Sequence, residues 1–395
     1  MNHQMLCQKK ILIKLHDAYL SRKERNSKVS LFTYMKLFLL FGIDVNFAKN
    51  NRKRRVLAFT TKMLMKCLAI WKFLTIVPEA YIMLKSSKSS KTMVVISASN
   101  LVGYMMWNYT IKHQTKLIKT LNKLRKLKKL LEISPPRQVI KVCFVFFASV
   151  SISFICLYSY DYDVSKSKMV SEILTFTVVD LNDIHWSAAL FSWHIYQFTW
   201  HYLSCFTCYF ALFYAITCLC MTSVLREHAK VNSYIIKRGL TKLTSNSIID
   251  DCLARYNLIL RTFDSINSVL SFPIFLECCY TSCEMFWVMY KVSKESNEIS
   301  VRHIFFLIIN FILFTFIVFS AASVHEADKI AKKSNISVLR LLSDRNRKQD
   351  IEILSQMCYS PPLTLTGWGF FEFTRGLYLT ALGCFVTYYL LIINL

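Results

Sequence analysis

The feature that most constrains this chain is a set of six long apolar blocks that contain no lysine or arginine. The only charged residues inside them are two acids, Glu277 and Glu284. A helix of about 20 apolar residues crosses a bilayer, and long uncharged blocks are typical of membrane proteins. The blocks predict membrane-spanning helices at 92–111, 142–160, 186–225, 265–290, 304–324 and 376–395.

A seventh apolar block, 56–84, carries a few charges but also predicts a span. Two of these charges, Lys62 and Lys66, lie near its start, where long side chains reach the lipid headgroups. The block 186–225 is long enough to suggest a hairpin of two spans. It has no glycine, proline or charge at its middle to turn the chain, so we expect one long helix and seven spans in all.

The composition and the placement of charge agree with this class. The chain is 54% hydrophobic with a formal net charge of +25, and its phenylalanine and tyrosine content excludes a disordered chain. The segments 1–55, 112–141, 225–264 and 325–373 hold 37 of the 49 lysines and arginines, whereas the other three connecting segments hold 8. Because these residues favour the cytosolic side, the N-terminus is predicted to be cytoplasmic and the C-terminus extracellular.

We therefore expect an all-α integral membrane protein with a single seven-helix domain over residues 1–395. Residues 1–55 form a basic cytosolic leader. The segments 225–264 and 325–373 are helix-rich by pattern and extend the helices into a cytosolic anchor layer.

The segment 112–132 has the pattern of a basic amphipathic helix. Leu117, Leu121, Leu124 and Leu131 recur at helical spacing with lysines between them. Since the segment is tied between two spans, we expect it to contact anionic membrane lipid, and we expect no nucleic-acid partner.

No pattern of an enzyme active site is present, so the chain is predicted not to be an enzyme, and no cofactor is expected. His325, Glu326 and Asp328 stand close together, but they follow a span at the start of an inner helix. We expect a solvated helix turn there rather than a metal site.

Polar residues inside spans are informative, because each is costly in lipid and tends to face a cavity or a partner. In the outer half of the fourth span, tryptophans and histidines recur every seven residues along one helical stripe. The stripe includes Trp193, His194, Gln197 and Trp200. It can line a small-molecule pocket, although ordinary helix packing explains the same pattern.

Glu284 lies in the outer half of the fifth span, one heptad after Glu277. A buried carboxylate there pairs with another group, ionises toward water or binds a cationic ligand. Polar residues on other outer half-spans complete a candidate ligand pocket that comprises Ser153, Tyr158, Trp193, His194, Gln197, Trp200, Glu284 and Asn310.

The last span has one strongly polar residue, Asn394, beside Leu391 and Leu395. In a single helix this amide only caps the helix end. Several copies around an axis would form a ring of amides beside rings of leucine, which is a filter and a hydrophobic gate. The residues alone leave both interpretations open.

The last span also carries a motif, in which Thr387 and Tyr388 are followed by five hydrophobic residues and then by Asn394 and Leu395. It resembles the signature of the insect gustatory receptor family, which is related to the insect odorant receptors. In that family glutamine and phenylalanine take the last two places. Two further segments, 364–373 and 38–44, also resemble family segments that precede the last and the first span.

The resemblance implies a homotetrameric or heterotetrameric ligand-gated channel in the plasma membrane of chemosensory neurons. Leu391, Asn394 and Leu395 match the family's pore positions, which monovalent and divalent cations would pass. Sugar receptors of the family have glutamate directly after Thr-Tyr, whereas Tyr389 stands there in this chain. This difference favours a bitter plant compound, or another non-sugar tastant, as the ligand.

Three alternatives stay open. The first is an odorant receptor subunit that needs a coreceptor. The second is a metabotropic receptor acting through G proteins, which the predicted cytoplasmic N-terminus disfavours. The third is a secondary transporter that relays protons through Glu277, Glu284 and a histidine of the fourth span.

Overall fold

The computed structural model describes residues 90–131, 186–237, 245–294, 301–342 and 359–394, with isolated residues and short pieces elsewhere. For 186–201 and 392–394 it describes the backbone and not the side chains. The predicted span at 142–160 and most of the one at 56–84 lie outside this part of the chain. Within it, all regular structure is helical except one short hairpin.

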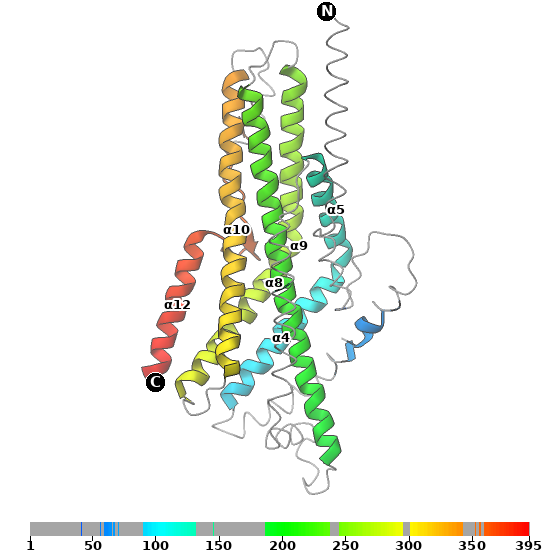
Figure 1. The fold of residues 1–395 in the computed structure, drawn as a ribbon, viewed down its shortest axis with the longest axis vertical. Helices are drawn as coiled ribbons and strands as arrows, with labels where there is room; N and C mark the ends of the chain where they lie inside the picture. The colour runs from blue at the N-terminus through cyan, green and yellow to red at the C-terminus, as the bar shows by residue number, and fades with distance from the viewer. Residues whose placement is uncertain are drawn as a thin grey trace, which may run out of the picture.

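Three long helices form the body of the molecule: α8 (Trp186–Lys237), α9 (Ser245–Lys294) and α10 (Val301–Leu342). Neighbours along the chain run in opposite directions (Figure 1). With 42 to 52 residues each, they are about 60–80 Å long, roughly twice the apolar thickness of a bilayer. They therefore extend well beyond the lipid. α8 is a single unbroken helix, which excludes the hairpin alternative for 186–225.

α8 is the central helix of the described bundle. Phe206, Tyr209, Phe210 and Phe213 are all fully buried, and so is most of its apolar stretch. A helix that is apolar around its whole circumference must be covered on every side. α9, α10 and α4 (Ser90–Lys112) provide that cover. Among the described residues, the helices long and apolar enough to cross a membrane are Tyr202–Tyr234, Cys252–Tyr290 and Ile304–Leu339.

Pro273 lies inside α9 near its middle, and the helix changes direction about halfway along its length (Figure 1). Proline has no N–H to donate to the carbonyl of Val269, and its ring crowds the preceding turn, so helices kink at this residue. The first half of α9 lies along α8 and α10, and the second half slants across them (Figure 1).

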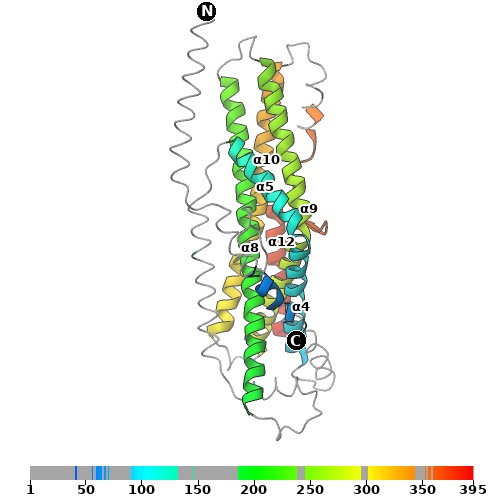
Figure 2. The same ribbon diagram turned by 90° about the vertical axis from the view of Figure 1, so that its right-hand side faces the viewer.

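α5 (Gln114–Leu130) follows α4 after a break at His113. The prediction of an amphipathic helix is confirmed, because Leu117, Leu121, Leu124 and Leu131 are all buried and four of the five lysines between them are exposed. Its apolar face lies across α8 and α9 (Figure 2).

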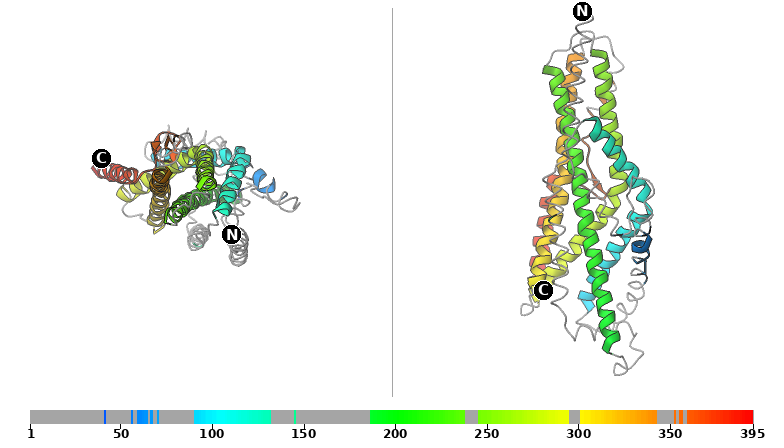
Figure 3. Two further views of the ribbon diagram at one scale, coloured as in Figure 1. Left: turned by 90° about the horizontal axis from the view of Figure 1, so that it is seen from above. Right: turned by 45° about the vertical axis from the view of Figure 1, so that its right-hand side comes forward.

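A hairpin precedes the last helix. Its strands β1 (Thr366–Gly367) and β2 (Phe371–Glu372) are antiparallel, with Thr366 opposite Glu372. Within the segment 325–373, which was expected to be helix-rich, residues 325–342 are helical and 366–372 form this hairpin. Two glycines allow a tight turn there, where a helix would be weak. α12 (Arg375–Asn394) follows at once and lies at the edge of the bundle (Figure 3).

Candidate functional site

One side of α12 packs against α9 and α10. The ring of Phe385 is 5.1 Å from that of Phe286 on α9 and 6.0 Å from that of Phe314 on α10. Tyr378 meets Phe319 of α10 at 5.0 Å. Phe385 is only 8% exposed, so these aromatic contacts hold the helix to the bundle.

The other side of α12 is not covered by any part of the chain that the structure describes. Thr380, Gly383, Thr387 and Leu391 are exposed and recur at spacings of three and four residues, which is one face of a helix. Leu391 is 51% exposed. Position 394 follows by three residues on the same face. An exposed, uncharged face on a predicted membrane span marks contact with lipid or with another protein surface.

The two motif residues whose side chains the structure describes, Thr387 and Tyr388, differ in their surroundings: Thr387 is on the exposed side of α12, and Tyr388 contacts the bundle. The Thr387 hydroxyl donates to the carbonyl of Gly383 at 2.9 Å, a bond within its own helix. Tyr388 packs edge-to-face on Phe286 at 5.1 Å. Leu395 and the side chain of Asn394 lie outside the part of the chain that the structure describes, so the amide and leucine rings stay a prediction.

A buried clasp holds the chain that leads into α12. The Lys332 ammonium on α10 donates to the carbonyl and hydroxyl of Ser360, at 2.8 and 3.0 Å, and to the carbonyl of Pro361 at 2.7 Å. It also pairs with the Asp328 carboxylate, 3.3 Å away and one turn earlier. The other partners of Asp328 are the backbone N–H of Leu363, at 3.0 Å, and the Tyr256 hydroxyl of α9, also at 3.0 Å.

This clasp corrects the prediction of a solvated turn around Asp328. The Asp328 side chain is 0% exposed and that of Lys332 is 7% exposed. The sequence showed the four-residue spacing of opposite charges that favours pairing on a helix. It did not show that the segment from Ser360 to Leu363 packs over this pair.

A polar network adjoins the clasp between α8, α9 and α10. Nε2 of His228 lies 3.0 Å from Oδ1 of Asn335, which also accepts from the Asn232 amide at 2.6 Å. The Cys252 thiol donates to Asn232 at 3.3 Å, and the imidazole stacks on Tyr256 at 5.5 Å. Nε2 also lies 3.2 Å from the Asn232 amide nitrogen, so it donates to Asn335 in one tautomer and accepts from Asn232 in the other.

His228 lies beyond the apolar run of α8 and is fully buried. Burial lowers the pKa of His228 to about 4; the hydrogen bond to Asn335 opposes this shift, and the Arg255 guanidinium adds to it. Burial also raises the pKa of the nearby Cys252 thiol. The imidazole is therefore neutral at ordinary pH.

The candidate pocket positions that the structure describes, at 193–200, 284 and 310, belong to helix segments toward one end of the bundle. The early part of α8, the late part of α9 and the early part of α10 lie toward the same end, because the three helices alternate in direction (Figure 1). Glu284 and Asn310 are buried, at 3% and 5% exposure. Ser153, Tyr158 and the side chains of Trp193, His194, Gln197 and Trp200 lie outside the described residues.

A buried polar cluster lies one turn from Glu284. The hydroxyls of Tyr280 and Ser204 are hydrogen-bonded at 2.9 Å between α9 and α8. Glu277 is 1% exposed, and its Oε2 has no hydrogen-bond partner in the described part of the chain. The transporter alternative placed Glu277 in a proton relay, but the histidine side chains it needs are not described.

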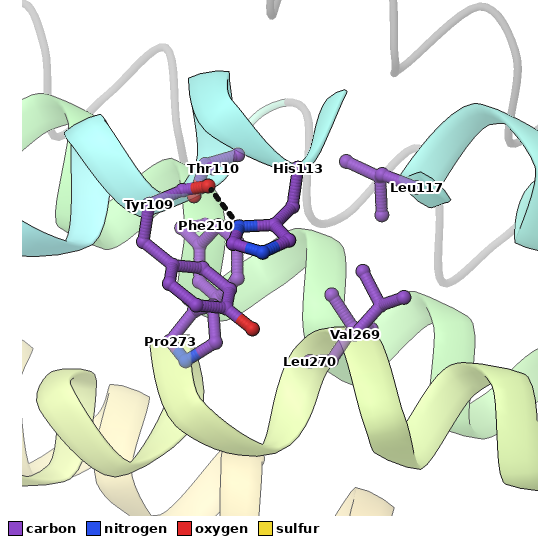
Figure 4. A pocket seen from close by; sticks show the side chains of 8 residues that line it. All are labelled: Tyr109, Thr110, His113, Leu117, Phe210, Val269, Leu270 and Pro273. Carbon is purple, nitrogen blue, oxygen red and sulfur yellow. Dashed lines mark hydrogen bonds between the residues drawn. The ribbon is translucent and has the colours of Figure 1, made fainter. Parts of the chain in front are cut away.

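A small cavity of about 10 Å³ lies beside the bend of α9. The rings of Tyr109 and His113 face Val269, Leu270 and Pro273 across it (Figure 4). Room of this size suits about one water molecule. Val269, whose carbonyl loses its usual helical donor at Pro273, lines the same space.

Known proteins resemble this chain along nearly its whole length. A family model described as 7tm Chemosensory receptor matches residues 30–394. The structure is similar to that of the insect olfactory receptor OR5 from Machilis hrabei, with 14% identity and a TM-score of 0.57, over 92% of this chain and 96% of the receptor. The same receptor in complex with eugenol gives a TM-score of 0.61 at 14% identity, over 96% and 98%. No curated protein matches the sequence.

These matches confirm the predicted fold class, an all-α membrane protein with seven helices. At 14% identity the structural likeness concerns the fold alone.

Proposed function

The chain belongs to the 7tm chemosensory receptor family, and on that basis we propose that it is a cation channel opened by a small organic molecule. The observation that carries the proposal is the uncovered face of α12. This helix is uncharged after Arg375, packs on the bundle by one side only, and exposes Thr380, Gly383, Thr387 and Leu391 on the other.

Four copies around an axis would turn these faces toward one another. Small and hydroxyl-bearing side chains would then line the inner part of the pore, and the rings of Leu391, Asn394 and Leu395 would lie at its outer end. Leucine rings close such a pore by excluding water, and an amide ring selects among permeant ions. Homomeric and heteromeric tetramers both suit this arrangement.

The ligand would bind at the end of the bundle where Glu284 and Asn310 are buried. The OR5 receptor, which has a similar fold, forms a complex with eugenol, and this supports a small-molecule ligand here. A ligand opens the channel only if it binds the open state more tightly than the closed one. Tyr389, in place of the glutamate that the sugar receptors have, supports a bitter or other non-sugar tastant.

The test is to record from excised patches of cells that express the chain alone while a panel of plant compounds is applied. We expect a cation current that appears with ligand and disappears on washout. Surface biotinylation provides the control. A well-exposed protein that passes no ligand-evoked current would count against a homomeric channel.

A second candidate is an odorant receptor subunit that requires a coreceptor, which the likeness to an olfactory receptor favours. Current that appears only on coexpression with a coreceptor would identify this role. Current from the chain alone would exclude the requirement.

A further inference from the structure

The hairpin before α12 is seated on the bend of α9. The Trp368 backbone N–H donates to the carbonyl of Ser271 at 3.2 Å. The Thr366 backbone N–H donates to Oδ1 of Asn267 at 3.1 Å. These two acceptors lie in the turns directly before Pro273, so the hairpin is bonded to the part of α9 where the helix changes direction.

Aromatic contacts between the hairpin and α9 lie on both sides of Pro273. The Trp368 ring is 4.6 Å from that of Phe272, edge-to-face, and 5.7 Å from that of Phe275. Phe370 stacks on Phe275 at 5.0 Å. The ring of Phe272 also lies 4.8 Å from that of Tyr109, which borders the small cavity on α4.

Trp368 has an unusual backbone conformation. Its φ of 50° places a bulky residue in the left-handed region, next to Gly369 at φ 78°. Such a residue is uncommon there, and it persists only where its surroundings hold it. The bond to Ser271 and the two aromatic contacts are those surroundings.

The hairpin and the start of α12 are one hydrogen-bonded unit. The Phe373 N–H donates to Leu365 at 2.9 Å, and the Leu377 N–H donates to Thr374 at 3.2 Å. Phe373 is fully buried against Tyr214 of α8. A displacement of the hairpin on α9 therefore moves the first turn of α12.

We propose that Trp368 is a positioning residue that couples the bend of α9 to α12. The second half of α9 carries Glu284 of the candidate pocket and also Phe286, which contacts α12 directly. α9 thus contacts the hairpin before Pro273 and α12 itself after Pro273, at Phe286. A change in the bend of α9 would therefore move the hairpin relative to the contact at Phe286. This inference rests on the proposed function, since gating is the motion it explains.

The test removes the contact between Trp368 and α9 and then links the hairpin to α9 by a disulfide instead. Trp368→Gly deletes the ring while tolerating the positive φ, and Tyr359→Ala is the control because Tyr359 is an exposed aromatic residue outside the hairpin. A disulfide between Asn267→Cys and Thr366→Cys then ties the hairpin to α9 without Trp368. Mass spectrometry verifies the bond.

We expect Trp368→Gly to lose most of the ligand-evoked current at normal surface expression, and Tyr359→Ala to keep it. In the Trp368→Gly background, the oxidised disulfide restores current and a reducing agent abolishes it again in the same patch. A purely structural role predicts no such reversible rescue. Normal current in Trp368→Gly, or a verified disulfide that fails to restore it, overturns the proposal.

A second measurement separates this inference from the proposed function. Hydrogen exchange of purified protein reports local opening without any current. Trp368→Gly should speed exchange at 375–382 by about a factor of ten relative to Tyr359→Ala, as expected for the loss of an aromatic contact. Faster exchange in a protein whose parent passes no current would retain the coupling and reject the channel. Equal exchange in the two variants contradicts the coupling.

Discussion

Lys332→Met tests whether the clasp between α10 and the chain before α12 stabilises the fold. The substitution keeps most of the side-chain volume but removes three hydrogen bonds and the ion pair. It leaves the Asp328 carboxylate buried without its cation. Breaking a buried pair in this way costs about 3–5 kcal/mol. The unfolding entropy is about 2.1 cal/mol/K per residue, so a chain of 395 residues should melt about 4–6 °C lower.

The assay is thermal unfolding of purified protein in detergent, followed by tryptophan fluorescence. Lys333→Met is the matched control, because Lys333 is the next residue and is exposed. It should change stability by no more than about 0.5 kcal/mol. Adding Asp328→Asn to Lys332→Met removes the stranded charge and should recover part of the loss. If Lys332→Met melts with the control, or the double variant melts below the single one, the clasp does not stabilise the fold in this way.

Two further predictions concern the polar network and the hairpin. The folded state holds His228 neutral, with a pKa of about 4. The unfolded chain therefore binds a proton first as the pH falls below about 6.5, and the stability of the protein decreases between pH 6.5 and 4. The melting temperature of His228→Gln should depend less on pH over that window, and an unchanged pH dependence would contradict this. A Cβ at Gly367 would lie 2.3 Å from the Phe371 ring, whereas one at Gly369 meets nothing within 4 Å. Gly367→Ala should therefore displace that ring and destabilise the hairpin. Gly369→Ala should add only the strain of its positive φ, about 1 kcal/mol. Equal melting temperatures for the two glycine variants would show that the ring yields without cost.

The helices could be predicted from the sequence because lipid imposes a simple rule on composition. A block such as 186–225 has no residue that turns or charges the chain, and α8 is correspondingly unbroken. The buried leucines of α5 followed from helical spacing in the same way. These features depend on neighbours within one or two turns.

The features that the sequence did not reveal depend on contacts between distant segments. The sequence predicts a solvated turn at Asp328, whereas its side chain is buried because Lys332 and the chain from Ser360 to Leu363 pack against it. His228 and Asn335 lie 107 residues apart and meet only because α8 and α10 pack together. The conformation of Trp368 is likewise imposed by its seat on α9 rather than by its own preference.

Oligomeric state and pore geometry are addressed most directly by thiol accessibility on the uncovered face of α12. The native Cys384 is exposed there, so the background is Cys384→Ser. In that background, Leu391→Cys should react with a small permeant thiol reagent when ligand is present, and the reaction should block the current. Phe385→Cys, on the packed side, should react far more slowly. Rapid block at Leu391→Cys is the result expected if this face lines the pore, and a current untouched by modification of that cysteine would contradict it.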